Sequence, residues 1–263
     1  MWLPLPVLSS HYSTMYSPFW MIDTGPMNHK TRYQTVLFDV GGTLIFPDPS
    51  VGHIYAKEAE SFGIQLSVQE AQGRFFKAWA KVKNDWASRL HYGRNDGESR
   101  MFWKAIVYET FAPYSNGLDM DPLFQHLYTH FGRPNIWSLY SDVLKTLSQL
   151  KSMGYTLGIL SNWDNRLPPI LEGLGISDYF DHSFISFAVG IEKPDIAIFK
   201  HVLNRLSSSH ESVLYIGNDY QDDYIPAQSL GINTLLIDRG DPVESEGPAS
   251  SISSLDGVFQ YLA

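Results

Sequence analysis

Short apolar runs alternate with amphipathic stretches along most of the chain. Five runs have the length and composition of buried strands, at residues 35–39, 156–160, 184–187, 213–216 and 234–237. Helical spacing separates most of these runs. Ser141 can cap one such helix, Gly154 can end it, and its apolar stripe is Val143, Leu144, Leu147 and Leu150. Strands that alternate with helices predict a parallel sheet with helices on both faces.

One interval breaks this alternation. Residues 47–135 carry only helical patterns, such as the stripe Val68, Ala71, Phe75, Ala78, Val82 and Trp86, and Asp121 before Pro122 marks another helix start as its N-cap. We therefore expect an α/β fold with an inserted all-helical cap at residues 47–135. Residues 32–46 and 136–263 would form a Rossmann-like three-layer α/β/α core around a parallel sheet of about five strands, and residues 240–254 read as a loop.

Composition narrows the class of protein. An apolar content of 44% with 18% charged residues is typical of a globular chain, and the net charge of −9 disfavours a nucleic-acid or anionic membrane surface. The absence of cysteine excludes disulfides, thiolate catalysis and thiolate zinc sites. No apolar stretch reaches the ~20 residues that span a bilayer. We expect a cytoplasmic protein with no membrane or nucleic-acid partner. Its oligomeric state has no signature in the sequence.

Residues 1–31 follow neither the helical nor the strand period. They contain several prolines and many aromatic residues, and Lys30 is their first basic side chain, unlike a secretory signal. We interpret them as a flexible N-terminal extension, or as residues before a true start at Met27, in preference to a docking segment.

Chemistry-bearing residues follow the first strand. The string FDVGGTL places Asp39 at its carboxyl end, before Gly41, Gly42 and Thr43. Ligands bind at such strand ends in open α/β sheets, where a carboxylate can act as nucleophile or metal ligand. An Asp that only caps the following turn is the alternative. Sugar kinases carry a similar phosphate loop, but further strands and a second glycine-rich loop follow theirs, whereas helices follow here.

Polar residues also follow the later strands. Ser161 and Asn162 can donate hydrogen bonds to phosphate oxygens, and Lys193 before Pro194 can hold a positive charge at the same edge. The string IGNDYQDD gathers carboxylates that a bound cation would stabilise, with Asn218, Asp219, Asp222 and Asp223 in one loop. Each piece alone also fits a cap, a solvated lysine or an acidic turn. Together they form the inventory of a phosphoryl-transfer site.

Four ordered motifs carry a family resemblance. FDVGGTL, LSNWDNRL, EKPD and IGNDYQDD resemble the motifs of haloacid dehalogenase-superfamily hydrolases, and the helical insertion resembles the cap of their subfamily I. The run from SNWDNRL to EKPDIAIF resembles the rhythmically-expressed-gene-2-like branch especially closely. The resemblance covers about residues 33–240.

The resemblance implies a role for each matching residue. Asp39 would attack phosphorus, and Lys193 would neutralise charge on the transferring group. Thr43, Ser161 and the backbone at Asn162 would bind phosphoryl oxygens. Magnesium would be held by Asp39, the Gly41 carbonyl and the last motif, through Asn218, Asp219 or Asp223. The implied activity is a Mg²⁺-dependent phosphatase acting on a small phosphorylated metabolite.

Two positions depart from the family pattern. Gly41 stands where the phosphatases have a second Asp that protonates the leaving oxygen, and Asn218 stands where many relatives have the first metal-binding Asp. Losing the acid forfeits ~10²–10⁴-fold in rate. Asp48 or His53 could replace it from the cap side, and Gly41→Asp should raise activity on poor leaving groups.

The missing acid leaves other activities open. A 2-haloacid dehalogenase needs no leaving-group proton, phosphonate cleavage would need a cap lysine that forms a Schiff base, and a binding protein on this fold needs no acid at all. Substrate choice would rest with the cap, where several basic side chains could meet an anionic substrate: Arg74, Arg89, Arg94, Arg100 and Lys104. Solvated helix faces also explain most of these charges.

Overall fold

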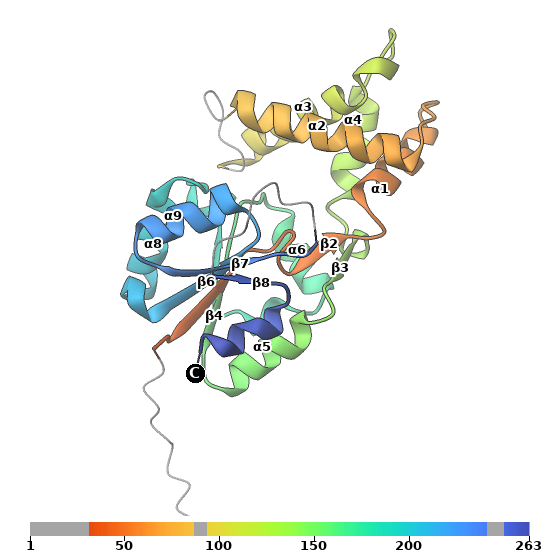
Figure 1. The fold of residues 1–263 in the computed structure, drawn as a ribbon. Coiled ribbons are helices and arrows are strands. Elements are labelled where there is room, and N and C mark those ends of the chain that lie inside the picture. The colour runs from red at the N-terminus through yellow and green to blue at the C-terminus, as the bar shows by residue number, and fades with distance from the viewer. Residues whose placement is uncertain (1–31, 87–93, 241–249, 263) are drawn as a thin grey trace, which may run out of the picture. The chain divides into compact units, whose positions relative to one another are not determined.

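The computed structural model describes residues 32–86, 94–240 and 250–262, which belong to one compact unit (Figure 1). The interpretation of residues 1–31 lies outside the described residues, as does most of the predicted loop at residues 240–254. Among the described helices, none is long and apolar enough to cross a membrane.

A six-stranded parallel sheet forms the core, in the order β5-β4-β1-β6-β7-β8. The predicted α/β class and the parallel sheet are confirmed. The strands are β1 Thr35–Phe38, β4 Thr156–Ser161, β5 His182–Ile185, β6 Val213–Gly217, β7 Asn233–Ile237 and β8 Ser251–Ile252. The sixth strand, β8, was not predicted, and it lies in the stretch that was expected to be a loop. A separate antiparallel pair joins β2 Ile45–Pro47 to β3 Trp137–Leu139.

Helices and short turns connect these strands. The core helices are α5 Val143–Ser152, α6 Leu167–Gly173, α7 Ser186–Val189, α8 Ile196–Leu206 and α9 Ile225–Ser229. Single 3₁₀ turns include η2 Pro134–Ile136, η3 Ser177–Tyr179 and η4 His210–Ser212. A longer 3₁₀ segment, η6, covers Leu255–Gln260, and η5 Tyr220–Tyr224 is a π-helical turn.

Two predicted boundaries in the core are wrong. The third predicted strand lies two residues earlier, because Ser186 already begins α7. Helix α5 has Asp142 rather than Ser141 at its N-cap position, and that side chain does not cap the helix. The Asp142 carboxylate instead accepts hydrogen bonds from Arg239, at 2.7 Å from Nη1, and from the Leu255 amide at 2.8 Å.

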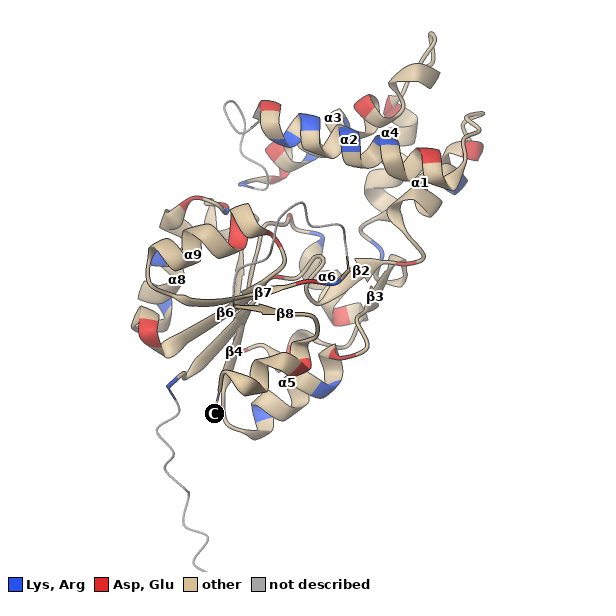
Figure 2. Ribbon diagram, in the orientation of Figure 1, with Lys and Arg blue, Asp and Glu red and all other residues tan. Residues whose placement is uncertain are grey.

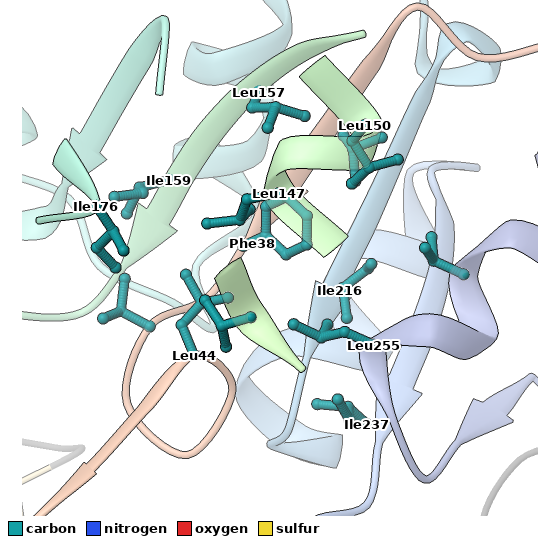
Figure 3. Close-up of a cluster of buried hydrophobic side chains, with 14 of the residues drawn as sticks. Phe38, Leu44, Leu147, Leu150, Leu157, Ile159, Ile176, Ile216, Ile237 and Leu255 are labelled. Atoms are coloured by element: carbon teal, nitrogen blue, oxygen red, sulfur yellow. The ribbon is translucent and has the colours of Figure 1, made fainter. Parts of the chain in front are cut away.

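Alternation along β1 divides the core into two layers. Val36 and Phe38 belong to a cluster on the face covered by α5 and η6, whereas Leu37 belongs to a cluster with α8 and α9 on the other face. Figure 3 shows the first cluster, where Phe38 lies beside Leu147 of α5. Because β1 is buried on both faces, Asp39 after it is held by a rigid element.

Four helices of the described residues lie between β2 and β3. They are α1 Val51–Glu60, α2 Val68–Trp86, α3 Asp96–Thr110 and α4 Asp121–His130, with the turn η1 Ala112–Tyr114 before α4. The N-cap position of α4 is Met120 rather than Asp121, because Asp121 already lies in the first turn with Pro122. These helices pack around their own buried cluster, which includes Tyr55 and Phe102. Figure 2 shows both signs of charge interspersed along them. The boundaries at residues 47 and 135 stay predictions.

Candidate active site at the strand ends

Asp39 lies at the carboxyl end of the central strand, and its backbone amide donates to Ile216 O at 2.9 Å. The residue is 7% exposed. Its Oδ1 accepts two hydrogen bonds, from Lys193 Nζ at 2.8 Å and from Ser161 Oγ at 2.9 Å. Three residues predicted from separate motifs thus meet at one carboxylate oxygen.

The Lys193 ammonium lies between two acidic side chains. Its Nζ is 2.8 Å from Asp39 Oδ1, 2.5 Å from Asp223 Oδ1 and 3.0 Å from the Tyr215 hydroxyl. All its hydrogens therefore have acceptors, as a buried ammonium requires. Tyr215 was not among the predicted residues, although a tyrosine in an otherwise apolar strand signals a hydroxyl that needs a partner.

Burial and charge act in opposite directions on this group of side chains. Burial raises the pKa of Asp39 to about 6, although the Lys193 ammonium lowers it. Burial alone would lower the pKa of Lys193, but the carboxylates of Asp223 and Asp39 raise it above its ordinary value. Lys193 is therefore a permanent cation at neutral pH, and Asp39 is ionised there but held in an environment that disfavours its charge.

Asn162 positions the lysine through its side chain. Its Nδ2 donates to Lys193 O at 2.8 Å, and its Oδ1 accepts from Lys193 N at 2.8 Å. This two-point contact fixes the backbone from which the Lys193 side chain extends. The predicted contact between Asn162 and phosphate would therefore be made by the main chain, and it stays a prediction.

Thr43 and Asn218 lie on the other side of Asp39. The Thr43 hydroxyl is 3.2 Å from Asn218 Oδ1 and 3.5 Å from Asp39 Oδ2. Gly42 has a φ of 77°, and a Cβ there would lie 2.4 Å from Asn218 Nδ2. Glycine at this position therefore lets the loop after β1 approach the loop after β6.

The acidic loop meets a cation from helix α2. Lys83 Nζ is 3.1 Å from Asp219 Oδ2 and 2.8 Å from Asp222 Oδ2. Burial alone would raise the pKa of Asp219, but Lys83 and backbone amides lower it below its ordinary value. Burial and the neighbouring Asp219 raise the pKa of Asp222. The sequence did not single out Lys83, because nothing local relates α2 to this loop.

The oxygen atoms around Asp39 suit a hard cation such as Mg²⁺. Asp39 Oδ2 and Asn218 Oδ1 both accept from the Thr43 hydroxyl. The two backbone hydrogen bonds that link Ile45 to Val40 and to Gly42 do not use the Gly41 carbonyl. Asp223, by contrast, has both oxygens engaged, since Oδ1 accepts from Lys193 and Tyr215 and Oδ2 accepts from the Asp219 amide. Asp39, Gly41 and Asn218 therefore fit a metal better than Asp223 does in this arrangement.

A second group of potential ligands lies on the cap helices. Ligand atoms of Glu58, His126 and His130 lie within 4.8 Å of one another, and Glu58 Oε2 is 2.5 Å from His126 Nε2. This group joins α1 to α4 and includes none of the residues predicted to hold magnesium.

The space above Gly41 is filled by Trp163. A Cβ on Gly41 would lie 3.0 Å from Trp163 Cζ3. The indole packs against Trp137, with ring centroids 5.0 Å apart. The Trp163 indole therefore occupies space that a side chain at position 41 would need.

A cavity of about 620 Å³ opens over Asp39. It is lined on one side by Ser161, Lys193 and the acidic loop, and on the other by aromatic side chains of the cap helices. Neither Asp48 nor His53 lines this cavity, and Asp48 Oδ2 accepts from Ser138 Oγ at 2.7 Å. The two predicted replacements for the missing acid therefore lie elsewhere.

The basic residues predicted on the cap do not all line the cavity. Arg94 lines the cavity, whereas Arg74 pairs with Glu70 at 2.9 Å and Lys104 pairs with Asp121 at 2.5 Å. The Arg100 guanidinium lies over the rings of Phe124 and Tyr128, and Arg89 lies outside the described residues.

The chain matches known proteins in both sequence and fold. Residues 33–231 match the model of a hydrolase family described as haloacid dehalogenase-like hydrolase. Haloacid dehalogenase-like hydrolase domain-containing protein 3 of Danio rerio is 34% identical over 84% of this chain and 93% of its own length. Rhythmically expressed gene 2 protein of Drosophila melanogaster is 26% identical over 80% of this chain and 85% of its own length.

A solved structure shares the fold. The magnesium-bound crystal structure of the putative HAD-hydrolase YfnB from Bacillus subtilis superimposes with a TM-score of 0.70 at 21% identity, covering 88% of this chain and 99% of that one. The resemblance of the four motifs, including the named branch, is confirmed. The chain belongs to the haloacid dehalogenase-like hydrolase family.

Proposed function

We propose that this hydrolase is a Mg²⁺-dependent phosphatase that acts on a small phosphate ester through a covalent intermediate on Asp39. The observation that carries the proposal is the buried contact between Asp39 and Lys193, at 2.8 Å, with Ser161 on the same carboxylate oxygen. A carboxylate fixed beside a permanent cation at the floor of a cavity is suited to in-line attack on a phosphoryl group.

The chain's own residues supply most of the chemistry. An oxygen of Asp39 attacks phosphorus, the bond from phosphorus to the ester oxygen breaks, and the leaving group takes the electron pair. Lys193 balances the negative charge that spreads over the phosphoryl oxygens, and Ser161 and Thr43 offer hydroxyl donors to them. Water then attacks the aspartyl-phosphate, which releases phosphate and restores Asp39.

Magnesium would be held by Asp39, the Gly41 carbonyl and Asn218. When bound, it would add positive charge next to the nucleophile and the transferring group. Asp219 stays a further candidate, because its carboxylate is near this edge of the sheet but pairs with Lys83.

Gly41 limits which esters can react. With no acid at this position, the leaving oxygen departs with little protonation, so esters of acidic alcohols or phenols should react best. The same feature favours a second candidate, displacement of halide from a 2-haloacid, since halide leaves without a proton. A magnesium requirement separates the two, because a dehalogenase of this kind needs no metal.

The test is hydrolysis of p-nitrophenyl phosphate with and without Mg²⁺. Turnover should require the metal and vanish in Asp39→Asn, while Asp178→Asn, at an exposed turn, should keep full activity. Metal-independent halide release that also needs Asp39 would favour the dehalogenase. Phosphate binding without turnover on any substrate would instead indicate a binding protein.

A further inference from the structure

We propose that the cavity over Asp39 is a subsite for an aromatic leaving group, so that aryl phosphate esters are the preferred substrates. This inference rests on the proposed phosphatase activity and names the substrate class of the same site. Two features carry it: the aromatic wall of the cavity and the absence of an acidic side chain at Gly41.

The wall of the cavity is aromatic on the cap side and at its base. Its rings belong to α2, α3, α4 and the loop after β4, namely Phe76, Trp79, Trp103, Tyr128 and Trp163. Trp79 and Trp103 lie with ring centroids 5.6 Å apart at an interplanar angle of 46°, so they do not stack face to face. Such a wall offers ring faces and edges to a flat apolar ligand.

Phe76 presents an exposed aromatic ring to the cavity. The residue is 54% exposed, although it lines the cavity and its neighbour Phe75 is buried at 7%. Its ring touches Phe75 with centroids 5.7 Å apart. An aromatic group held in the cavity would cover this ring, and burial of apolar surface contributes roughly 25 cal/mol per Å².

The chemistry at position 41 selects the same class. Position 41 is a glycine with the Trp163 indole close beside it, so it provides no acidic side chain to protonate the ester oxygen. An aryl oxide is a far more stable anion than an alkoxide, so it can depart without that proton. The cavity therefore recognises by shape the esters that the site can cleave without an acid.

A substrate panel separates shape from leaving-group acidity. We would measure kcat/KM with Mg²⁺ for phenyl phosphate, naphthyl phosphate and hexafluoroisopropyl phosphate, whose fluorinated alcohol is about as acidic as phenol. Recognition of the ring predicts that both aryl esters react roughly 2- to 12-fold faster than the fluoroalkyl ester, which corresponds to one aromatic contact. Equal rates for phenyl and hexafluoroisopropyl phosphate would overturn the inference and leave the proposed function intact.

Substitution of Phe76 provides the second readout. Phe76→Ala should lower the ratio of naphthyl to fluoroalkyl kcat/KM by roughly 2- to 12-fold, the usual worth of an aromatic pair. Met101→Ala is the matched control, because Met101 is 47% exposed on α3 and does not line the cavity, so the ratio should not change. An unchanged ratio in Phe76→Ala would also overturn the inference. Absence of Asp39-dependent turnover on all three esters would refute the phosphatase itself.

Discussion

The contact between Gly41 and Trp163 determines what a restored acid can achieve. A Cβ at position 41 would meet Trp163 Cζ3 at 3.0 Å, and the carboxyl group of an aspartate needs more room still. The indole is held from behind by Trp137, at a centroid distance of 5.0 Å. We therefore expect Gly41→Asp alone to lose about 1–3 kcal/mol of unfolding free energy, the usual cost of overpacking, and to gain little activity.

Replacing Trp163 by a smaller side chain should let the restored acid raise the rate of hydrolysis. In the double variant Gly41→Asp/Trp163→Leu, the new carboxyl group has space beside Asp39. A positioned general acid contributes ~10²–10⁴-fold, so kcat/KM for an alkyl phosphate should rise by about that factor. The gain should be smaller for p-nitrophenyl phosphate, because its leaving group needs little protonation.

The assay compares four proteins: the parent, each single variant and the double variant. Steady-state hydrolysis of an alkyl and an aryl phosphate gives the rates, and urea unfolding gives the free energies. Trp163→Leu alone controls for the loss of the ring. If Gly41→Asp alone gains as much on alkyl phosphate as the double variant, Trp163 does not block the position. If neither gains while aryl hydrolysis persists, the acid comes from another residue.

Three further predictions concern charged and titratable side chains. Lys193→Met should abolish turnover and lower the unfolding free energy by about 3–5 kcal/mol in urea, because it leaves two buried carboxylates uncompensated. The control Lys151→Met, at an exposed ion pair, should cost less than about 1 kcal/mol. Equal costs for the two variants would contradict this prediction. Asp142→Ala should lower the unfolding free energy by about 1.5–3 kcal/mol, measured the same way, because it removes the charge-assisted bonds to the Arg239 guanidinium; a change below about 0.5 kcal/mol would show that this pair is not stabilising. Burial lowers the pKa of His130, so between its folded pKa and about 6.5 the unfolded chain binds more protons and stability falls as pH drops. His130→Gln should reduce the loss of unfolding free energy between about pH 8 and about pH 5 relative to the parent, and an identical loss would refute the assignment.

The sheet and the placement of the site residues were largely predictable, for one physical reason. Parallel strands end at the same edge of a sheet, so Asp39, Ser161 and Lys193 could be expected together from their positions after apolar runs. The roles of these residues stay predictions. Strand β8 escaped detection because Ser251–Ile252 is too short to show a period.

Contacts that depend on tertiary placement could not be predicted. Lys83 lies in a helix whose own sequence gives no indication of the loop that it meets, 136 residues away at Asp219. The Asn162 side chain suits a phosphate oxygen and a peptide group equally well, and the fold uses it for the Lys193 peptide. Likewise, nothing in the sequence around Trp163 indicates that its ring covers Gly41.

The central position of β1 also bears on how the protein folds. Its two neighbours in the sheet, β4 and β6, come far later in the chain, and the bond from Ser161 to Asp39 joins residues 122 positions apart. Closing so long a loop costs chain entropy before any contact compensates for it, so such topologies fold slowly. The β2–β3 pair, which brings together the two ends of the helical insertion, shortens the effective loop once the insertion has folded. Because its partners come from three other strands and the loops after them, the carboxylate of Asp39 acquires its environment only when the sheet is complete.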